Sequence, residues 1–148
     1  MSRNWKPGNI VEIPLKNGIY AYGVIIESPL IAFSTLYFSE PQTEFDTLFN
    51  ELSFKIWVMK HAISKRHWKV VGHIDVDIEK PVFYKFDLIP KRYSHYFDDQ
   101  EVESSLDECI GLECAAVWDP EHVEERLFAV NLGKESIWEK SLRAENRA

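Results

Sequence analysis

Apolar and polar residues alternate in the first part of the chain with the two-residue period of β-strands. Two such runs, residues 10–15 and 19–26, flank Asn17-Gly18. Asn-Gly between apolar-rich runs favours a type I′ turn, because that turn requires positive φ at both central residues. The pattern therefore predicts an opening β-hairpin. The alternation places these residues on shared faces: Val11, Ile13 and Leu15 on the first strand, and Tyr20, Tyr22, Val24 and Ile26 on the second.

Further strands are predicted where short apolar runs end at prolines or polar turns. Their ranges are residues 31–38, 54–59, 68–78 and 82–88. Residues 31–38 are partly apolar on both faces, which favours a central strand. Residues 43–52 carry apolar side chains at helical spacing and predict one to two turns of helix. Between these elements, the sequence predicts a basic connector at residues 60–67 and an aromatic-rich turn at residues 93–97.

The hydrophobic pattern changes to a helical period near the C-terminus. Asp119 is a typical N-cap residue, and Pro120 suits the first helical position. Gly133 is a typical residue after the end of a helix, so a helix is predicted over residues 120–130. A second short helix is predicted over residues 134–143.

Six or so strands with short connections, followed by helices, predict the fold class. It is mainly β (α+β): a single small, strongly bent antiparallel sheet or barrel that opens with a β-hairpin and ends in one or two helices. The 148 residues are predicted to form one domain, residues 1–148. Its β-rich part is expected at about residues 5–118 and its helical part at about residues 119–143.

The composition suits a packed core, with 45% apolar and 14% aromatic residues. The sequence has no apolar run of about 18 residues and no apolar signal-peptide core at its start, so we expect a cytoplasmic protein without membrane association. Cys109 and Cys114 are too few for a disulfide framework and are not spaced as a redox pair, which favours reduced thiols. The sequence leaves the oligomeric state open.

The net charge of −7 is concentrated in the second half of the chain, where residues 98–125 hold eleven acidic residues and no Lys or Arg. Such a stretch is either a solvated face or a surface for a basic partner, because its self-repulsion falls when a cation docks. The residues predicted to bind such a partner are Asp98, Asp99, Glu101, Glu103, Asp107 and Glu108. The same charge argues against nucleic acid as a partner, although residues 60–69 form a basic loop that includes Trp68.

Candidate chemistry is sparse, because the sequence has neither a nucleotide-binding glycine motif nor a nucleophile elbow. On a strand, His73, Asp75 and Asp77 would present three potential metal ligands on one face, which supports a metal-assisted hydrolase as one hypothesis. The polar outer face of a strand explains the same pattern without a metal or any other cofactor. A third hypothesis is a peptide- or ligand-binding adaptor with a small set of aromatic anchors. These anchors are Tyr20, Tyr22 and Trp57.

The chain opens with a distinctive series of residues: Lys6-Pro7-Gly8-Asn9-Ile10-Val11-Glu12-Ile13-Pro14-Leu15, then Asn17-Gly18 and Tyr20-Ala21-Tyr22-Gly23-Val24-Ile25. Its middle contains Trp68-Lys69-Val70-Val71-Gly72. These segments resemble the immunity protein 26 family of bacterial polymorphic toxin systems. Asn9 and Val24 depart from the family pattern, in which an acid and an arginine are usual. The resemblance covers the first half of the chain and hardly extends into the acidic stretch.

The resemblance implies a non-enzymatic cytoplasmic protein that binds and neutralises a cognate toxin domain. Many such toxins are nucleases with basic surfaces. An acidic inhibitor of a basic toxin is expected to associate fast, at a rate that falls as salt increases. Charge reversal of Asp98, Asp99, Glu101 and Glu103 would distinguish this hypothesis from the hydrolase and the adaptor, because only toxin binding depends on these acids.

Overall fold

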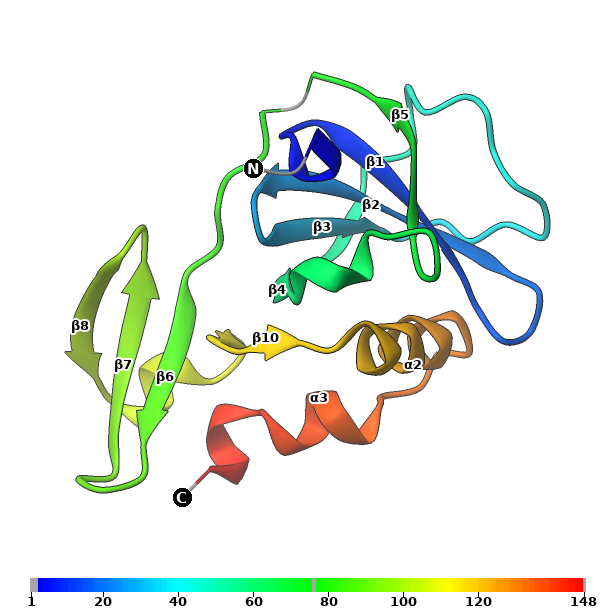
Figure 1. The fold of residues 1–148 in the computed structure, drawn as a ribbon. Helices are drawn as coiled ribbons and strands as arrows, with labels where there is room; N and C mark the ends of the chain where they lie inside the picture. Colours follow the sequence, from blue (N-terminus) through cyan, green and yellow to red (C-terminus); the bar gives the residue numbers. More distant parts are fainter. Residues whose placement is uncertain (1–2, 76, 148) are drawn as a thin grey trace.

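The computed structural model describes residues 3–75 and 77–147, which fold into two β-sheets with helices along one side (Figure 1). The larger sheet has six strands in the order β10-β4-β3-β2-β1-β5. They are β1 (Asn9–Pro14), β2 (Tyr20–Glu27), β3 (Leu30–Ser34), β4 (Leu52–Val58), β5 (Lys69–His73) and β10 (Val117–Trp118). The smaller sheet has the order β8-β7-β6-β9, with β6 (Phe83–Asp87), β7 (Arg92–Phe97), β8 (Gln100–Ser104) and β9 (Glu113–Cys114). The α-helices are α1 (Leu106–Cys109), α2 (Pro120–Asn131) and α3 (Ile137–Ser141), and three short 3-10 turns are Arg3–Trp5, Lys60–Ala62 and Ala144–Asn146.

The prediction of a mainly β fold with C-terminal helices is confirmed. Two details differ. Within the described residues the strands form two open sheets and not one, and neither sheet closes into a barrel. Each sheet also includes one parallel pair, β10 with β4 and β6 with β9, beside its antiparallel pairs. The short strands β9 and β10 come late in the chain and pair with the edges of β6 and β4, which precede them by many residues. The local sequence pattern does not indicate such distant pairing.

The opening hairpin forms as predicted, but its turn is of another kind. The N–H of Leu15 donates to the carbonyl of Ile19 at 2.8 Å, which leaves three residues in the loop. Only Gly18 has positive φ, at 78°, so the predicted type I′ turn is wrong. A three-residue hairpin loop needs the left-handed conformation only at its last position, and Gly18 supplies it there. Two successive positive φ values occur instead at Asp98-Asp99, 49° and 66°, between β7 and β8.

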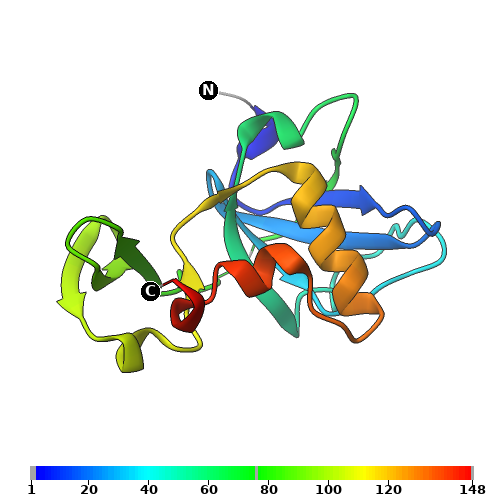
Figure 2. The same cartoon turned by 90° about the horizontal axis from the view of Figure 1, so that it is seen from below.

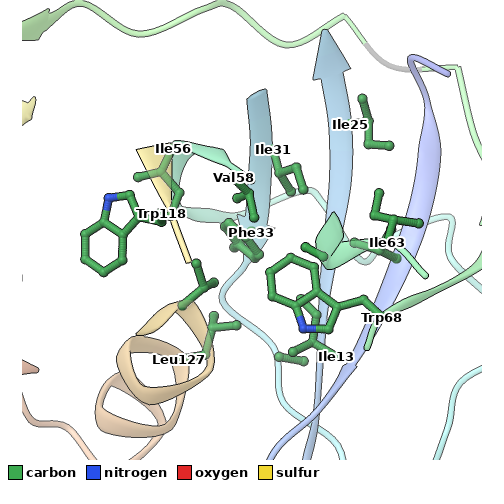
Figure 3. Close-up of a cluster of buried hydrophobic side chains, with 14 of the residues drawn as sticks. Ile13, Ile25, Ile31, Phe33, Ile56, Val58, Ile63, Trp68, Trp118 and Leu127 are labelled. Atoms are coloured by element: carbon green, nitrogen blue, oxygen red, sulfur yellow. The ribbon is translucent and has the colours of Figure 1, made fainter. Parts of the chain in front are cut away.

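Both faces of the larger sheet are buried. One face carries the predicted set Val11, Ile13 and Leu15 and packs against α2, with Leu127 fully buried in the same cluster (Figure 3). Seen from below, α2 crosses this face of the sheet (Figure 2). The other face carries Tyr22 and Val24, as the alternation predicts, and is covered by residues 35–51. Strand β3 is buried on both faces and lies between β4 and β2, which confirms the prediction of a central strand.

Three local predictions are wrong. Residues 43–52 form turns around Phe45 to Leu48 and not a helix, because their apolar side chains pack individually onto the sheet. Residues 93–97 belong to strand β7 and not to a turn. The strand predicted over residues 68–78 ends at His73, because the chain leaves the larger sheet there to reach the smaller one.

The helix predicted over residues 120–130 is confirmed as α2, together with its signals. Asp119 Oδ1 accepts a hydrogen bond from the N–H of Glu121 at 2.9 Å, and Pro120 occupies the first position. Gly133 follows the helix with φ of 71°. The second predicted helix is shorter than residues 134–143 and spans only α3.

Candidate partner-binding site

A cleft of about 310 Å³ lies where the two sheets meet. Its lining comes from the ends of β2, β4, β6 and β7 and from the segment before β6. Trp57 of the larger sheet and Tyr96 of the smaller sheet both line it, as do Asp98 and Asp99 of the β7–β8 turn. The cleft therefore brings together one predicted aromatic anchor and two of the predicted acidic residues, which are far apart in the sequence.

The cleft has an aromatic wall. The ring of Trp57 lies 4.6 Å from that of Phe83 and meets the ring of Tyr96 edge to face at 5.4 Å, measured between centroids. Phe83 is buried, whereas Trp57 and Tyr96 are partly exposed. Lys85 lies with Nζ 4.4 Å from the centroid of the Tyr96 ring. Aromatic faces attract cations, so this wall suits a positively charged group.

Acidic side chains form the rim of the cleft. Asp98 and Glu27, which lies at the end of β2, both line the cleft. Lys80 connects them, with Nζ 2.7 Å from Glu27 Oε2 and 3.0 Å from Asp98 Oδ1. Asp99 Oδ1 accepts a hydrogen bond from Tyr96 at 2.7 Å, and this bond raises the pKa of the Tyr96 hydroxyl. The rim thus combines negative charge with a cation that is already bound.

Strand β8 carries the next two predicted acids on one face of the smaller sheet. Glu101 lies 3.3 Å from Lys85 Nζ and also accepts a hydrogen bond from Ser94 at 3.1 Å. Glu103 lies 4.0 Å from the guanidinium of Arg92. The acidic stretch lacks basic residues in sequence, but the pairing of β7 with β8 and β6 supplies them in space. Part of the predicted self-repulsion is therefore relieved inside the protein.

The remaining two predicted acids lie in α1, directly after β8. Glu108 forms a capping box with Ser105, and the hydrogen bonds from Ser105 lower the pKa of the Glu108 carboxyl. Asp107 is exposed in the first turn of the same helix. We call the six residues Asp98, Asp99, Glu101, Glu103, Asp107 and Glu108 the acidic hairpin. They lie along one continuous segment at the edge of the smaller sheet.

Two of the three predicted aromatic anchors lie away from the cleft. Tyr22 is fully buried in the larger sheet, where its hydroxyl donates to Glu12 at 2.9 Å and accepts from the N–H of Gln42 at 2.7 Å. Burial raises the pKa of Tyr22 to about 12. Tyr20 packs with it in the same cluster. Tyr22 therefore offers no surface to a partner, and Tyr20 is partly exposed but lies outside the cleft. Of the three predicted anchors, Trp57 is the one that lines the cleft.

The predicted ligand face of His73, Asp75 and Asp77 does not form. The strand ends at His73, and both aspartates lie in the irregular segment that follows it. His73 Nδ1 hydrogen-bonds Asn9 Oδ1 at 2.9 Å, and its Nε2 lies 3.6 Å from Asp75. Among residues 3–75 and 77–147, His, Cys, Asp and Glu side chains form no group of three that could hold a metal ion. The prediction that one strand face presents these three side chains is wrong.

Sequence reasoning missed most of the cleft lining, including Phe83, Tyr96 and Lys80. The strand around Phe83 was predicted, but nothing in its pattern indicates that it packs against Trp57. Tyr96 was assigned to a turn, and Lys80 follows a segment predicted as strand. Residues 92–97 show no two-residue alternation, and the signal that could have placed Tyr96 is the aromatic content of this run, because Tyr and Phe are enriched in strands.

A comparison with protein-family models matches residues 6–95 to a single description, immunity protein 26. This chain belongs to the immunity protein 26 family. The match covers β1 to β6 and most of β7. The immunity protein 26 segment therefore includes Trp57, Lys80 and Phe83, whereas the acidic hairpin lies beyond its end. No curated protein and no solved structure matches the chain. Within the described residues, none of the helices has the length and apolar character needed to span a membrane.

Proposed function

We propose that this immunity protein is a non-enzymatic inhibitor that binds a cognate toxin domain through the acidic hairpin and the adjoining cleft. The observation that carries the proposal is the position of Trp57 beside Asp98 and Asp99, which combines an aromatic anchor with negative charge at the junction of the sheets. Family membership supports the immunity role. The proposal assigns the protein to the cytoplasm, in keeping with its two free cysteines.

The charge distribution supports a basic partner. The net charge is −7, and the acidic hairpin contributes six carboxylates from one short segment. Three of these, Asp98, Glu101 and Glu103, have cationic neighbours in the protein, so Asp99, Asp107 and Glu108 carry the charge that is least compensated by ion pairs. A basic toxin surface would be attracted over about a Debye length, roughly 8–10 Å at ordinary salt. Such steering accelerates association more than it changes the final affinity.

Binding by this surface would block the toxin by covering its active site or its access to substrate. A basic patch on a nuclease-like toxin is the same patch that attracts its polyanionic substrate, so an acidic protein competes for it directly. Trp57 would supply the contact area that charge alone does not, because aromatic residues at the centre of an interface carry much of the binding energy.

The test uses a variant that neutralises three acids of the acidic hairpin while keeping side-chain size: Asp99→Asn, Glu103→Gln and Asp107→Asn. Glu108 is left unchanged because its carboxylate caps α1, and Glu103 is changed in its place because its pair with Arg92 is long, at 4.0 Å. Asn tolerates the left-handed backbone at position 99. A matched control changes three exposed acids in the loop that covers the far side of the larger sheet: Glu40→Gln, Glu44→Gln and Glu51→Gln. Both variants change the net charge by the same amount.

In bacteria that express the cognate toxin, the hairpin variant should lose protection and the control should keep it. Purified hairpin variant should also associate with the toxin about tenfold more slowly at low salt. Equal protection and equal association by the two variants would contradict the proposed surface.

A further inference from the structure

The side chain of Lys80 lies in the cleft although it belongs to the segment that crosses between the two sheets. Its ammonium group contacts one carboxylate from each sheet, Glu27 at 2.7 Å and Asp98 at 3.0 Å. One positive charge thus occupies a position between two acids and beside an aromatic wall. The rim of the cleft is therefore a site that binds a cation in the free protein.

The Lys80 ion pairs are accessible to solvent. The side chains of Glu27 and Asp98 are 62% and 63% exposed, and that of Lys80 is 35% exposed. The hydrogen bonds that Lys80 donates to these two carboxylates raise the pKa of Lys80, so the lysine is charged at every physiological pH. Exposed ion pairs of this kind exchange readily with other cations, because each contributes little net stability.

Lys80 is not needed to hold the sheets together. Trp57 of the larger sheet already contacts both Phe83 and Tyr96 of the smaller one. The strands β9 and β10 belong to different sheets and are separated by only two residues. This short covalent connection is a second link between the sheets. The contact between the sheets would therefore persist if the Lys80 side chain moved away from Glu27 and Asp98. Another cation can then replace its ammonium group at these two carboxylates.

We propose that the cleft binds an arginine side chain presented by the toxin, and that this arginine displaces Lys80. This inference rests on the proposed function and names the residue that the cleft recognises. A planar guanidinium has several donors in a fixed fork, so it can bridge Glu27 and Asp98 as the ammonium does. It can also stack on an aromatic ring, and the partly exposed Trp57 provides one in the same cleft. Arginine therefore fits both the rim and the wall, whereas an ammonium satisfies chiefly the rim.

The displacement leaves Lys80 as a positive charge near the entrance of the cleft. Its long, flexible stem can move the ammonium towards solvent or towards Asp99, which also lines the cleft. Because Lys80 competes for the same carboxylates, it lowers the apparent affinity of the cleft for an incoming cation. Removing the lysine charge should thus strengthen the binding of arginine and not weaken it.

The test uses N-acetyl-arginine-methylamide as the probe and does not require the toxin. Binding is followed by the shift of the Trp57 indole N–H signal in two-dimensional nitrogen–proton spectra, with the signal assigned by its loss in Trp57→Phe. The citrulline analogue is the neutral control probe. Lys80→Met keeps the aliphatic stem and removes the charge. Lys85→Met is the matched control, because Lys85 contacts the ring of Tyr96 and pairs with Glu101 but does not itself line the cleft.

The expected result is a saturable shift of the Trp57 signal with the arginine probe, none with citrulline, and at least threefold tighter binding by Lys80→Met than by Lys85→Met. No saturable shift in Lys80→Met, an equal response to citrulline, or equal binding by the two lysine variants would overturn the inference. Circular dichroism confirms that each variant is folded before titration, and Lys80→Gln replaces any Lys80→Met sample that is not. A failed probe experiment leaves toxin binding by the acidic hairpin intact, and a failed protection experiment leaves arginine binding by the cleft intact.

Discussion

The rings of Trp57 and Tyr96 meet edge to face at 5.4 Å between centroids, although one belongs to the larger sheet and the other to the smaller. The contact positions the acidic turn, because Asp98 and Asp99 directly follow the strand that carries Tyr96. The cleft, its rim and the orientation of the two sheets therefore depend on the same aromatic cluster.

Truncating this cluster should destabilise the protein. Trp57→Ala removes the ring contacts with Phe83 and Tyr96, and we expect a loss of about 2–3 kcal/mol in the free energy of unfolding. Trp57→Phe keeps a ring and should lose about 1 kcal/mol. Urea denaturation measures both values. A change below about 0.5 kcal/mol for Trp57→Ala would show that the ring does not hold the junction.

Two glycines with positive φ should respond very differently to substitution. Gly8 has φ of 93°, and an added Cβ would lie 2.4 Å from the carbonyl oxygen of Ile74. Gly18 has φ of 78° with open space around it. Gly18→Ala should therefore lose about 1 kcal/mol, which is the cost of the left-handed backbone alone. Gly8→Ala must also move a backbone atom, so it should lose at least about 2 kcal/mol more. Equal melting temperatures would contradict this account of the opening segment.

The sequence predicted what depends on local pattern and missed what depends on return contacts. The hairpin and α2 were predictable because alternation, Gly18 and the Asp119-Pro120 pair act over a few residues. The turns at residues 43–52 were not, because packing onto the sheet overrode a helical spacing of apolar residues. Counter-charges for the acidic stretch were also hidden, because Lys85 and Arg92 reach it only through strand pairing.

The cleft was only half predictable for the same reason. Trp57, Asp98 and Asp99 each stood out in sequence, by residue type or by charge. Their meeting requires the smaller sheet to contact the larger one at the ring of Trp57, and the sequence predicted a single sheet. Lys80 could not be placed in the cleft without that arrangement.

Stability should fall at alkaline pH, because two tyrosines hold their protons more tightly in the folded protein than in the unfolded chain. Burial raises the pKa values of Tyr22 and Tyr37 to about 12, whereas an unfolded tyrosine titrates near 10. Above pH 10 the unfolded chain has released protons that the folded chain retains, so the unfolded state becomes favoured as pH rises towards 12. Each group contributes up to about 1.4 kcal/mol per pH unit in this window. Tyr22→Phe should reduce the slope measured by urea denaturation between pH 10 and 11.5, and an unchanged slope would contradict the assignment.

Arg126 should be the costliest cation to remove. Its side chain is 4% exposed, forms a two-pronged pair with Glu113 and lies 3.8 Å from the ring centroid of Phe54. Arg126→Met leaves Glu113 without its partner, so we expect a loss of about 3–5 kcal/mol in the free energy of unfolding. Arg92→Met is the control, because Arg92 is 58% exposed and its exposed pair with Glu103 should contribute less than about 1 kcal/mol. Similar losses in the two variants would contradict the claim that burial of the Arg126–Glu113 pair determines its contribution to the free energy of unfolding.

The most direct test of the central claim is the association rate with the cognate toxin domain, measured as a function of salt. The toxin is recovered by pull-down from the native bacterium at low salt and identified by mass spectrometry. For the wild-type protein and the Glu40, Glu44 and Glu51 control, we predict a rate that is high at low salt and falls steeply as salt increases. For the Asp99, Glu103 and Asp107 variant, we predict a slower rate with a shallower dependence on salt. Identical salt dependence in all three proteins would contradict the claim that the acidic hairpin binds the toxin.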